Sequence, residues 1–187
     1  MFIRFVTFFF LIAGSLCAQV SNHRVLFSPE DHLAEELISL IEKERSSIRL
    51  AAYYLSHKQV IKALIYAHER GVNVQVVLDP KSLRSEAIID QMKKLPFPVL
   101  VFDPPITYRV LKNGKKVRQR KPLMHDKFCV FGEDRVWTGS FNFTLDASRV
   151  NKENALIVES REIASSYLAE FEKIKNLSSR DLSKHSP

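Results

Sequence analysis

The stretch "HDKFCVFGEDRVWTGSFNFT", from His125 to Thr144, decides how this sequence is interpreted. Its apolar pattern predicts two strands joined by a turn. Side chains two residues apart along a strand face the same way, so His125 and Lys127 share one side, and Ser140 and Asn142 form a second such pair. A core strand has no need of these polar groups, whereas a site that attacks a phosphate does.

In the rest of the chain, strand patterns alternate with helical patterns. This alternation predicts an α/β fold, a mixed β-sheet flanked by helices on both faces, in one domain over residues 24–177. A flexible tail is expected at residues 178–187. The predicted strands cover residues 24–29, 47–55, 72–79, 98–103 and 153–160, besides two around a turn at 132–134, and the predicted helices cover residues 30–46, 57–71, 85–95 and 161–177.

The first residues, "MFIRFVTFFFLIAGSLCAQV", have the layout of a secretory signal peptide. One arginine precedes an apolar run from Phe5 to Ala13, which is shorter than the roughly 20 residues that a membrane-spanning helix needs. We expect residues 1–18 to be removed and the protein to be periplasmic or secreted, with an uncleaved anchor as the alternative.

The composition is that of an ordinary globular protein, with 45% hydrophobic and 26% charged residues. The net charge is +7, and loss of Arg4 with the leader would leave +6, which favours anionic partners such as nucleic acid or a lipid surface. Cys129 would then be the remaining cysteine, so no internal disulfide is expected, and its apolar surroundings predict a buried residue.

The polar pairs have a chemistry in common. Lys127 is placed to hold an anionic oxygen, with His125 beside it as a nucleophile or base. The side chains of Ser140 and Asn142 can donate hydrogen bonds to non-bridging phosphate oxygens. Glu153 opens the next strand, and a carboxylate that accepts the other imidazole N–H would fix the histidine tautomer.

Three segments, "MHDKFCVF", "TGSFNFT" and "NKENALIV", resemble the phospholipase D superfamily, whose signature is H-x-K, four residues and Asp, followed by a G-S-x-N segment. The chain is most similar to the small single-motif members, a secreted bacterial endonuclease and its mitochondrial relatives. The resemblance implies a phospholipase D-like sandwich with one half-site per chain. At the position of the motif aspartate this chain has Gly132, although a slipped turn could bring Glu133 or Asp134 into that place.

The resemblance also implies a two-step displacement that needs no metal and no other cofactor. His125 forms a phosphohistidine, and a second histidine protonates the leaving oxygen and then activates water. Lys127 and Asn142 neutralise charge on the phosphoryl oxygens, with Ser140 assisting and Glu153 orienting the imidazole. The other histidines have no matching lysine, so a homodimer with a shared active site is expected to supply the second His125.

A basic ribbon, "KNGKKVRQRK", precedes the histidine and is predicted to turn at Asn113–Gly114. It is either a solvated hairpin or a substrate-binding surface at the mouth of the site, where phosphate contacts would add salt-dependent affinity. Its cations are Lys112, Lys115, Lys116, Arg118, Arg120 and Lys121.

Two classes of function follow. The first is an exported metal-independent phosphodiesterase, with nucleic acid favoured as the substrate. The alternative substrate is a phosphatidylcholine-type phospholipid, hydrolysed to phosphatidate and alcohol with peripheral membrane contact. The second class is a nucleic-acid or membrane-surface binding protein whose catalysis is impaired by the change at Gly132.

Overall fold

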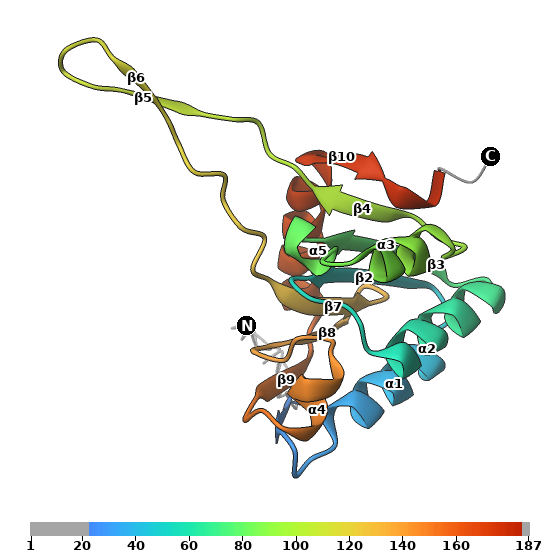
Figure 1. The fold of residues 1–187 in the computed structure, drawn as a ribbon. Coiled ribbons are helices and arrows are strands. Elements are labelled where there is room, and N and C mark those ends of the chain that lie inside the picture. Colours follow the sequence, from blue (N-terminus) through green and yellow to red (C-terminus); the bar gives the residue numbers. More distant parts are fainter. Residues whose placement is uncertain (1–22, 185–187) are drawn as a thin grey trace, which may run out of the picture.

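A mixed eight-stranded sheet lies at the centre of the computed structural model, which describes residues 23–184 (Figure 1). The predicted signal peptide lies outside the described residues. The strand order is β1-β9-β8-β7-β2-β3-β4-β10. The strands are β1 (His23–Phe27), β2 (Ser47–Ala52), β3 (Asn73–Leu78), β4 (Val99–Phe102), β7 (Lys127–Phe131), β8 (Arg135–Gly139), β9 (Asn154–Glu159) and β10 (Ser178–Asp181).

The middle of the sheet combines parallel and antiparallel pairs. Strands β2, β3 and β4 are parallel neighbours, joined by crossovers that contain helices. Strands β7, β8, β9 and β1 continue the sheet from β2 as antiparallel neighbours. Central strands such as β7 are buried along their whole length, as expected for a sheet covered on both faces.

Helices cover both faces of the sheet, which confirms the predicted fold class. On one face, Leu33, Leu37 and Ile41 of α1 recur at helical spacing and are fully buried in the larger core cluster. On the other face, Phe171 and Ile174 of α5 pack in a second cluster. The helices are α1 (Leu33–Lys43), α2 (Lys58–Glu69), α3 (Glu86–Lys93), α4 (Leu145–Arg149) and α5 (Arg161–Asn176), with 3₁₀ turns η1 (Pro80–Ser82) and η2 (Leu182–Lys184).

The chain after α5 is ordered by pairing, so the prediction of a flexible tail from residue 178 is wrong for residues 178–184. Strand β10 pairs antiparallel with β4, an edge that would otherwise be open. The Asp181 carboxylate accepts a hydrogen bond from the Val99 amide, and Leu182 is 1% exposed. Along residues 23–184, no helix combines the length and the apolar character that crossing a membrane requires.

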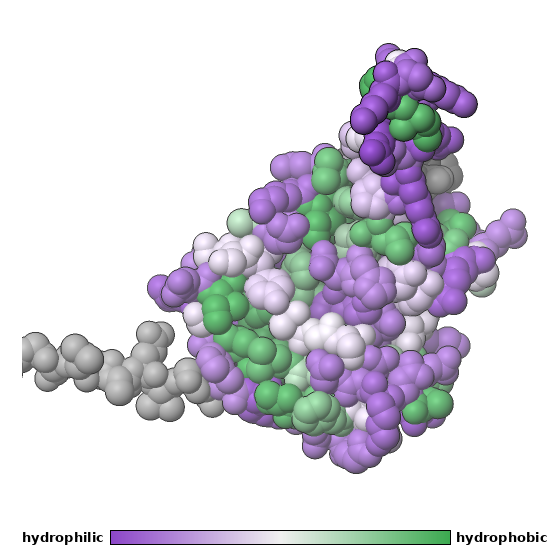
Figure 2. All heavy atoms as spheres, turned by 90° about the vertical axis from the view of Figure 1, so that its left-hand side faces the viewer, coloured by the Kyte–Doolittle hydropathy of each residue, from purple (hydrophilic) through white to green (hydrophobic). Residues whose placement is uncertain are grey.

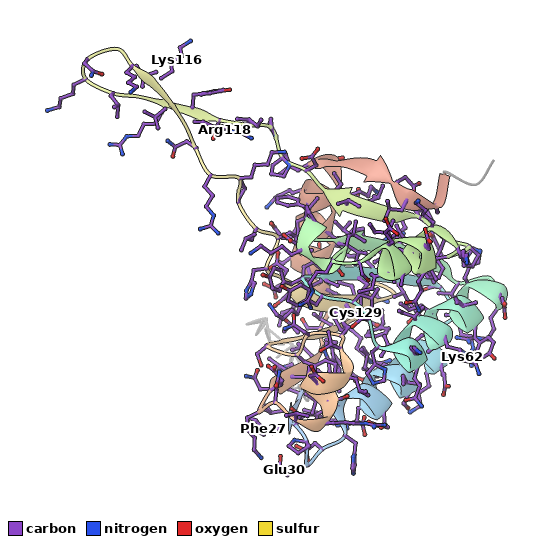
Figure 3. All side chains as sticks on the ribbon, viewed as in Figure 1. Phe27, Glu30, Lys62, Lys116, Arg118 and Cys129 are labelled. Atoms are coloured by element: carbon purple, nitrogen blue, oxygen red, sulfur yellow. The ribbon has the colours of Figure 1, made fainter. Side chains whose placement is uncertain are left out.

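The basic ribbon forms an arm that stands away from the sheet (Figures 1 and 3). Strands β5 (Tyr108–Val110) and β6 (Lys116–Arg118) pair as a hairpin around Asn113–Gly114, as predicted. We call residues 105–123 the hairpin arm; all of them are exposed. Figure 2 shows the arm end-on, with a mostly hydrophilic surface and apolar side chains among the charged ones.

Candidate active site

The predicted site residues gather at one end of the sheet because of its topology. Strand β7 runs antiparallel to β2 and β8, and β9 runs antiparallel to β8. The start of β7 therefore lies beside the end of β8 and the start of β9. Lys127 opens β7, Ser140 follows β8 and Glu153 precedes β9, so the topology brings three distant parts of the sequence together.

His125 and Lys127 meet just before β7. The Lys127 Nζ atom lies 3.2 Å from His125 Nδ1 and 3.4 Å from His125 Nε2. It also donates a 2.6 Å hydrogen bond to the His125 carbonyl oxygen. His125 precedes the strand itself, yet the two side chains share one side, as their spacing predicts. His125 is exposed and Lys127 is 7% exposed, so an accessible imidazole stands beside a buried cation.

The electrostatic environment makes Lys127 an unusual lysine. Burial lowers the pKa of its ammonium group, against the opposing effect of the Asp126 and Glu153 carboxylates. Burial also raises the pKa of the Asp126 carboxyl, and Glu170 on α5 adds to this effect. A buried cation of this kind is stabilised by an anionic ligand that enters from the exposed histidine side.

Two side chains hydrogen-bond the Glu153 carboxylate, and neither is the predicted partner, the His125 imidazole. Ser140 Oγ donates a short hydrogen bond to Glu153 Oε2, and Asn151 Nδ2 donates to Oε1 at 3.1 Å. Within one chain, these contacts replace the expected hydrogen bond from the His125 imidazole. Ser140 Oγ in turn accepts from the Asn154 amide at 3.0 Å, so Ser140 and Glu153 form one connected unit.

Ser28 holds the Glu153 segment in place through hydrogen bonds, and the sequence analysis did not identify it. It is fully buried, accepts a 3.0 Å hydrogen bond from the Glu153 amide and donates a 2.8 Å bond to the Asn151 carbonyl oxygen. The signal available in the sequence was the "FSP" segment that ends β1, which pairs with β9. Strand β1 thus holds the Glu153 loop in place.

Asn142 is presented between two buried phenylalanines. Phe141 and Phe143 are fully buried, and the Phe143 carbonyl oxygen accepts 2.9 Å hydrogen bonds from the Ser56 and His57 amides. This anchoring leaves Asn142 at the surface of the site, partly exposed. Its Oδ1 atom is buried and has no hydrogen-bond partner among residues 23–184. The F-N-F alternation is therefore the local reason why the asparagine faces the site.

Two tyrosines at the end of β2 also belong to the site, although the sequence analysis did not identify them. The Tyr53 ring lies 4.4 Å from the His125 ring, and the Lys127 Nζ atom is 5.1 Å from its centroid. Tyr54 packs against Tyr53 at 4.2 Å. Both follow a run of buried residues in "RLAAYYL", where adjacent tyrosines mark the point at which the strand leaves the core.

Gly132 lies at the opposite end of β7 from His125. Its φ of +56° lies in the left-handed region, and a Cβ atom there would be 3.3 Å from Ser46 Oγ and 3.7 Å from each Glu44 carboxylate oxygen. Glu133 and Asp134 are exposed, so the carboxylate beside this turn comes from Glu44. Sequence reasoning had looked for it in the next two residues.

The Glu44 carboxylate is well held in this position. It accepts hydrogen bonds from the Ser46 hydroxyl and amide, both at 2.7 Å, and from the Arg45 amide at 3.0 Å. Burial acts to raise the pKa of Glu44, but these hydrogen bonds outweigh it and the pKa lies below its usual value. The carboxylate is thus ionised and occupies the space next to Gly132.

The arm cations are not gathered around His125 in the same chain. The six predicted residues are exposed, and Figure 3 places Lys116 and Arg118 on the distant part of the hairpin arm. Lys121, near its base, forms an ion pair with Asp103. Only the base of the arm leads into β7. Within one chain, therefore, only this base can border the site, whereas the sequence analysis considered the whole ribbon.

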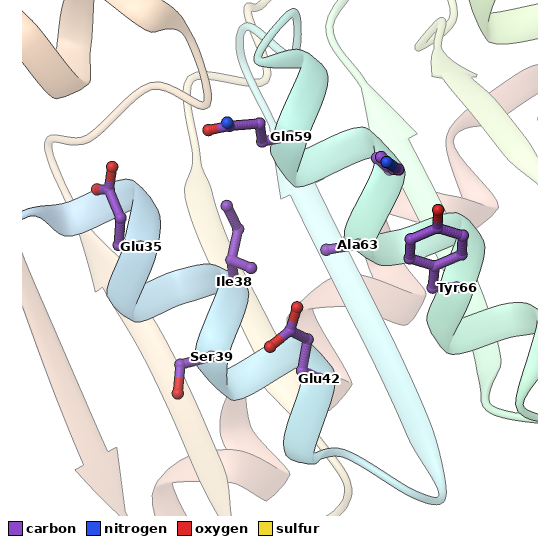
Figure 4. Close-up of a pocket in the computed structure, with 8 residues that line it drawn as sticks. Glu35, Ile38, Ser39, Glu42, Gln59, Ala63 and Tyr66 are labelled. Carbon is purple, nitrogen blue, oxygen red and sulfur yellow. The ribbon is translucent and has the colours of Figure 1, made fainter.

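His57, at the start of the helix predicted over residues 57–71, precedes α2 in the structure; it is 4% exposed, and burial lowers its pKa. A groove of about 420 Å³ runs between α1 and α2, and none of the predicted site residues line it (Figure 4). The predicted catalytic residues therefore lie at the His125 end of the sheet, outside this groove.

Comparison with known proteins identifies the family of the chain. The family described as "Cardiolipin synthase, PLD-like domain" matches residues 37–175. Phospholipase D of Rickettsia prowazekii is 30% identical over 148 residues, 79% of this chain and 65% of the relative. Mitochondrial cardiolipin hydrolase of Xenopus tropicalis is 30% identical over 146 residues, 77% of this chain and 61% of the relative.

A solved structure extends the comparison to the fold. Nuc, a phospholipase D family member from Salmonella typhimurium, superposes with a TM-score of 0.72 and 29% identity, over 86% of this chain and 97% of that one. Fold and site together define a phospholipase D-like α/β domain. The chain belongs to the phospholipase D superfamily. It spans 65% and 61% of the length of the two curated relatives.

Proposed function

We propose that this protein is a metal-independent phosphodiesterase that hydrolyses nucleic acid through a phosphohistidine intermediate. The observation that carries the proposal is the exposed imidazole of His125 beside the buried ammonium group of Lys127, 3.2 Å apart. Such a pair places a nucleophile next to a group that neutralises the phosphoryl oxygens. Asn142 and the Ser140–Glu153 unit lie at the same end of the sheet and support this assignment.

The first step forms a covalent intermediate. A ring nitrogen of His125 attacks phosphorus and forms an N–P bond while the bond to the leaving oxygen breaks. A second, protonated histidine gives its proton to that oxygen. Lys127 and Asn142 hydrogen-bond the non-bridging oxygens, where negative charge is held during the transfer.

The second step releases the product. Water attacks the phosphohistidine, and the second histidine, now neutral, accepts the proton of that water. The N–P bond breaks, which restores His125 and leaves a phosphomonoester. The cationic side chains supply the charge neutralisation throughout, so the reaction is expected to proceed in EDTA.

A second copy of the chain is proposed to supply the second histidine. His57 lies near this end of the sheet, where its amide hydrogen-bonds the Phe143 carbonyl oxygen, but it is 4% exposed before α2 and is therefore not open to a substrate as His125 is. A twofold axis next to the exposed His125 would bring two imidazoles to one phosphate. The Glu153 carboxylate, which hydrogen-bonds Ser140 and Asn151 in its own chain, would then face the imidazole of the other copy.

The choice of nucleic acid rests on the hairpin arm and on the small single-motif chain. The arm carries seven exposed cations, the six predicted ones and Arg109, which would follow a phosphate backbone without reading its sequence. In a dimer, an arm that stands away from its own sheet is free to extend along a substrate bound at the shared site. Export is part of the same proposal and is supported by the leader-like residues 1–18.

Phospholipid is the second candidate substrate, favoured by a specific observation. Tyr108, Val110 and Ile106 on the arm are 57%, 60% and 42% exposed, next to the cations, a combination that suits an anionic membrane surface. The curated relatives are named phospholipase D and mitochondrial cardiolipin hydrolase. In this alternative the same chemistry would cleave a lipid headgroup.

The test offers both substrates to the purified protein in EDTA, with His125→Ala as the inactive control. Cleavage of labelled single-stranded DNA alone supports the proposal. Choline release from phosphatidylcholine vesicles alone assigns the lipid reaction. If a folded wild-type protein hydrolyses neither substrate nor a small chromogenic diester, the enzyme assignment is wrong and the binding-protein alternative takes its place.

Subunit mixing tests the shared site. A heterodimer of wild-type and His125→Ala chains would lack one of the two required histidines. An equal mixture, after exchange, should therefore retain about one quarter of the activity rather than the half expected of independent sites. A fully active monomer by light scattering would refute the shared-site proposal.

A further inference from the structure

A cavity of about 320 Å³ opens beside the candidate active site and shares Asn142 and Tyr54 with it. Asn142 lines it together with Asn151, whose side chain hydrogen-bonds Glu153. Tyr54 and Arg84 form the other side. A molecule whose phosphodiester is held at His125 would therefore extend directly into this cavity.

Arg84 is held beside the cavity by a cation–π contact with Tyr54. Its guanidinium carbon lies 3.9 Å from the centroid of the Tyr54 ring. A guanidinium held over a ring by a cation–π contact still has N–H donors that can bind an anion. Arg84 is exposed, so a ligand can reach it.

A continuous row of contacts connects Arg84 to the nucleophile. The rings of His125 and Tyr53 are 4.4 Å apart, and those of Tyr53 and Tyr54 are 4.2 Å apart. Arg84 follows at 3.9 Å from Tyr54. The row holds the Arg84 guanidinium at a set distance from the Lys127 ammonium group. The rings of Tyr53 and Tyr54 lie between the two cations.

Apart from Leu145, the remaining wall of the cavity is polar. The Asn142 Oδ1 atom is buried without a partner among the described residues, and Asp146 contributes a carboxylate that opposes anion binding. An anion in the cavity would thus bind close to Arg84 and away from Asp146. Removal of the Asp146 charge should strengthen its binding.

We propose that Arg84 binds the second phosphate of a substrate that carries two neighbouring phosphodiesters, and so sets which bond lies at His125. This inference rests on the proposed function only in that His125 acts on a phosphodiester. Two sources share the required chemistry. An oligonucleotide joins successive phosphates through a sugar, and a diphosphatidyl lipid joins them through glycerol.

Binding measured in a His125→Ala background separates the subsite from turnover. The probe is a fluorescent trithymidylate with two charged phosphates, compared with versions in which one or the other phosphate is an uncharged methylphosphonate. We expect loss of one particular charge to weaken binding by about tenfold when Arg84 is present. The Arg84→Ala substitution should abolish this difference, and Arg84→Lys should restore part of it.

Matched variants and a parallel comparison with lipid vesicles complete the experiment. Arg161→Ala, an exposed arginine at the start of α5, should leave the discrimination intact, and Asp146→Asn should increase it. Vesicles of cardiolipin and of phosphatidylglycerol, matched in total charge, give the same comparison for a lipid. Discrimination confined to cardiolipin would assign the subsite to a lipid.

Two results would overturn the inference. One is an Arg84→Ala variant that retains the discrimination, and the other is a variant that weakens every probe to the same extent. A failure of the proposed function is seen separately, as the absence of hydrolysis by the wild-type protein. The binding comparison judges Arg84 in either case.

Discussion

An aspartate at position 132 would restore the sequence signature of the superfamily, yet we expect Gly132→Asp to destabilise this protein and leave its turnover no higher. The backbone at Gly132 has a φ of +56°, which a residue with a Cβ atom adopts at a cost. The new side chain would also start 3.7 Å from both oxygens of the Glu44 carboxylate. Two independent penalties therefore act on the same substitution.

Their magnitudes follow from the geometry. The left-handed conformation costs about 1 kcal/mol for aspartate, the lower end of the usual range. Two carboxylates about 4 Å apart repel by about 4 kcal/mol at an effective dielectric of 20, and the exposure of this turn reduces that to about 1 kcal/mol. The sum of about 2 kcal/mol corresponds to a fall in Tm of about 4–8 °C for a chain of this size.

Two companion variants separate the penalties in thermal melts followed by circular dichroism. Gly132→Asn carries the backbone cost without the charge and should lose about half as much Tm. In the Glu44→Gln background, Gly132→Asp should lower Tm by only about half as much, because the repulsion between the two carboxylates is absent. Hydrolysis of a chromogenic diester is measured for each. A Gly132→Asp protein as stable as the wild type, or one with clearly higher turnover, would refute this reasoning.

Three further expectations follow from the site. Lys127→Met removes a buried ammonium group, so we expect Tm to rise by about 2–4 °C, or about 1 kcal/mol, while diester hydrolysis falls at least about 100-fold; a fall in Tm would contradict the electrostatic argument. Asp126→Asn should raise Tm at pH 7, because the folded-state pKa of this carboxyl lies above its unfolded value. The gain should shrink as the pH falls through the folded pKa and vanish below about 3.9, the unfolded value, and a gain that grows in acid would oppose this. Glu153→Gln should lower turnover strongly and leave the dimer intact by light scattering, and unchanged turnover would remove Glu153 from the site.

Local patterns predicted the parts of this molecule that depend on neighbours in sequence. The two-residue spacing placed Lys127 beside His125. Strand and helix periodicities gave the sheet with helices on both faces. In each case the deciding contact is made within a few residues or follows from burial of an apolar face.

Pairings between distant segments could not be predicted in the same way. Ser28 holds the Glu153 loop because β1 pairs with β9, and Glu44 lies beside Gly132 because the end of α1 packs near the β7–β8 turn. No pattern in the sequence near Ser178 predicts that the following residues pair with β4. These contacts depend on the order of strands in the sheet, which periodicity does not reveal.

The position of Gly132 bears on whether the chemistry survives the altered signature. Six residues of largely extended chain lie between it and His125, a span of roughly 20 Å. A carboxylate at position 132 could therefore not contact a phosphate held at His125. It would act on the β7–β8 turn, where the Glu44 carboxylate already accepts hydrogen bonds from Ser46 and Arg45. The substitution thus changes the contacts at one end of β7, while the histidine, lysine and asparagine of the proposed mechanism lie at the other end.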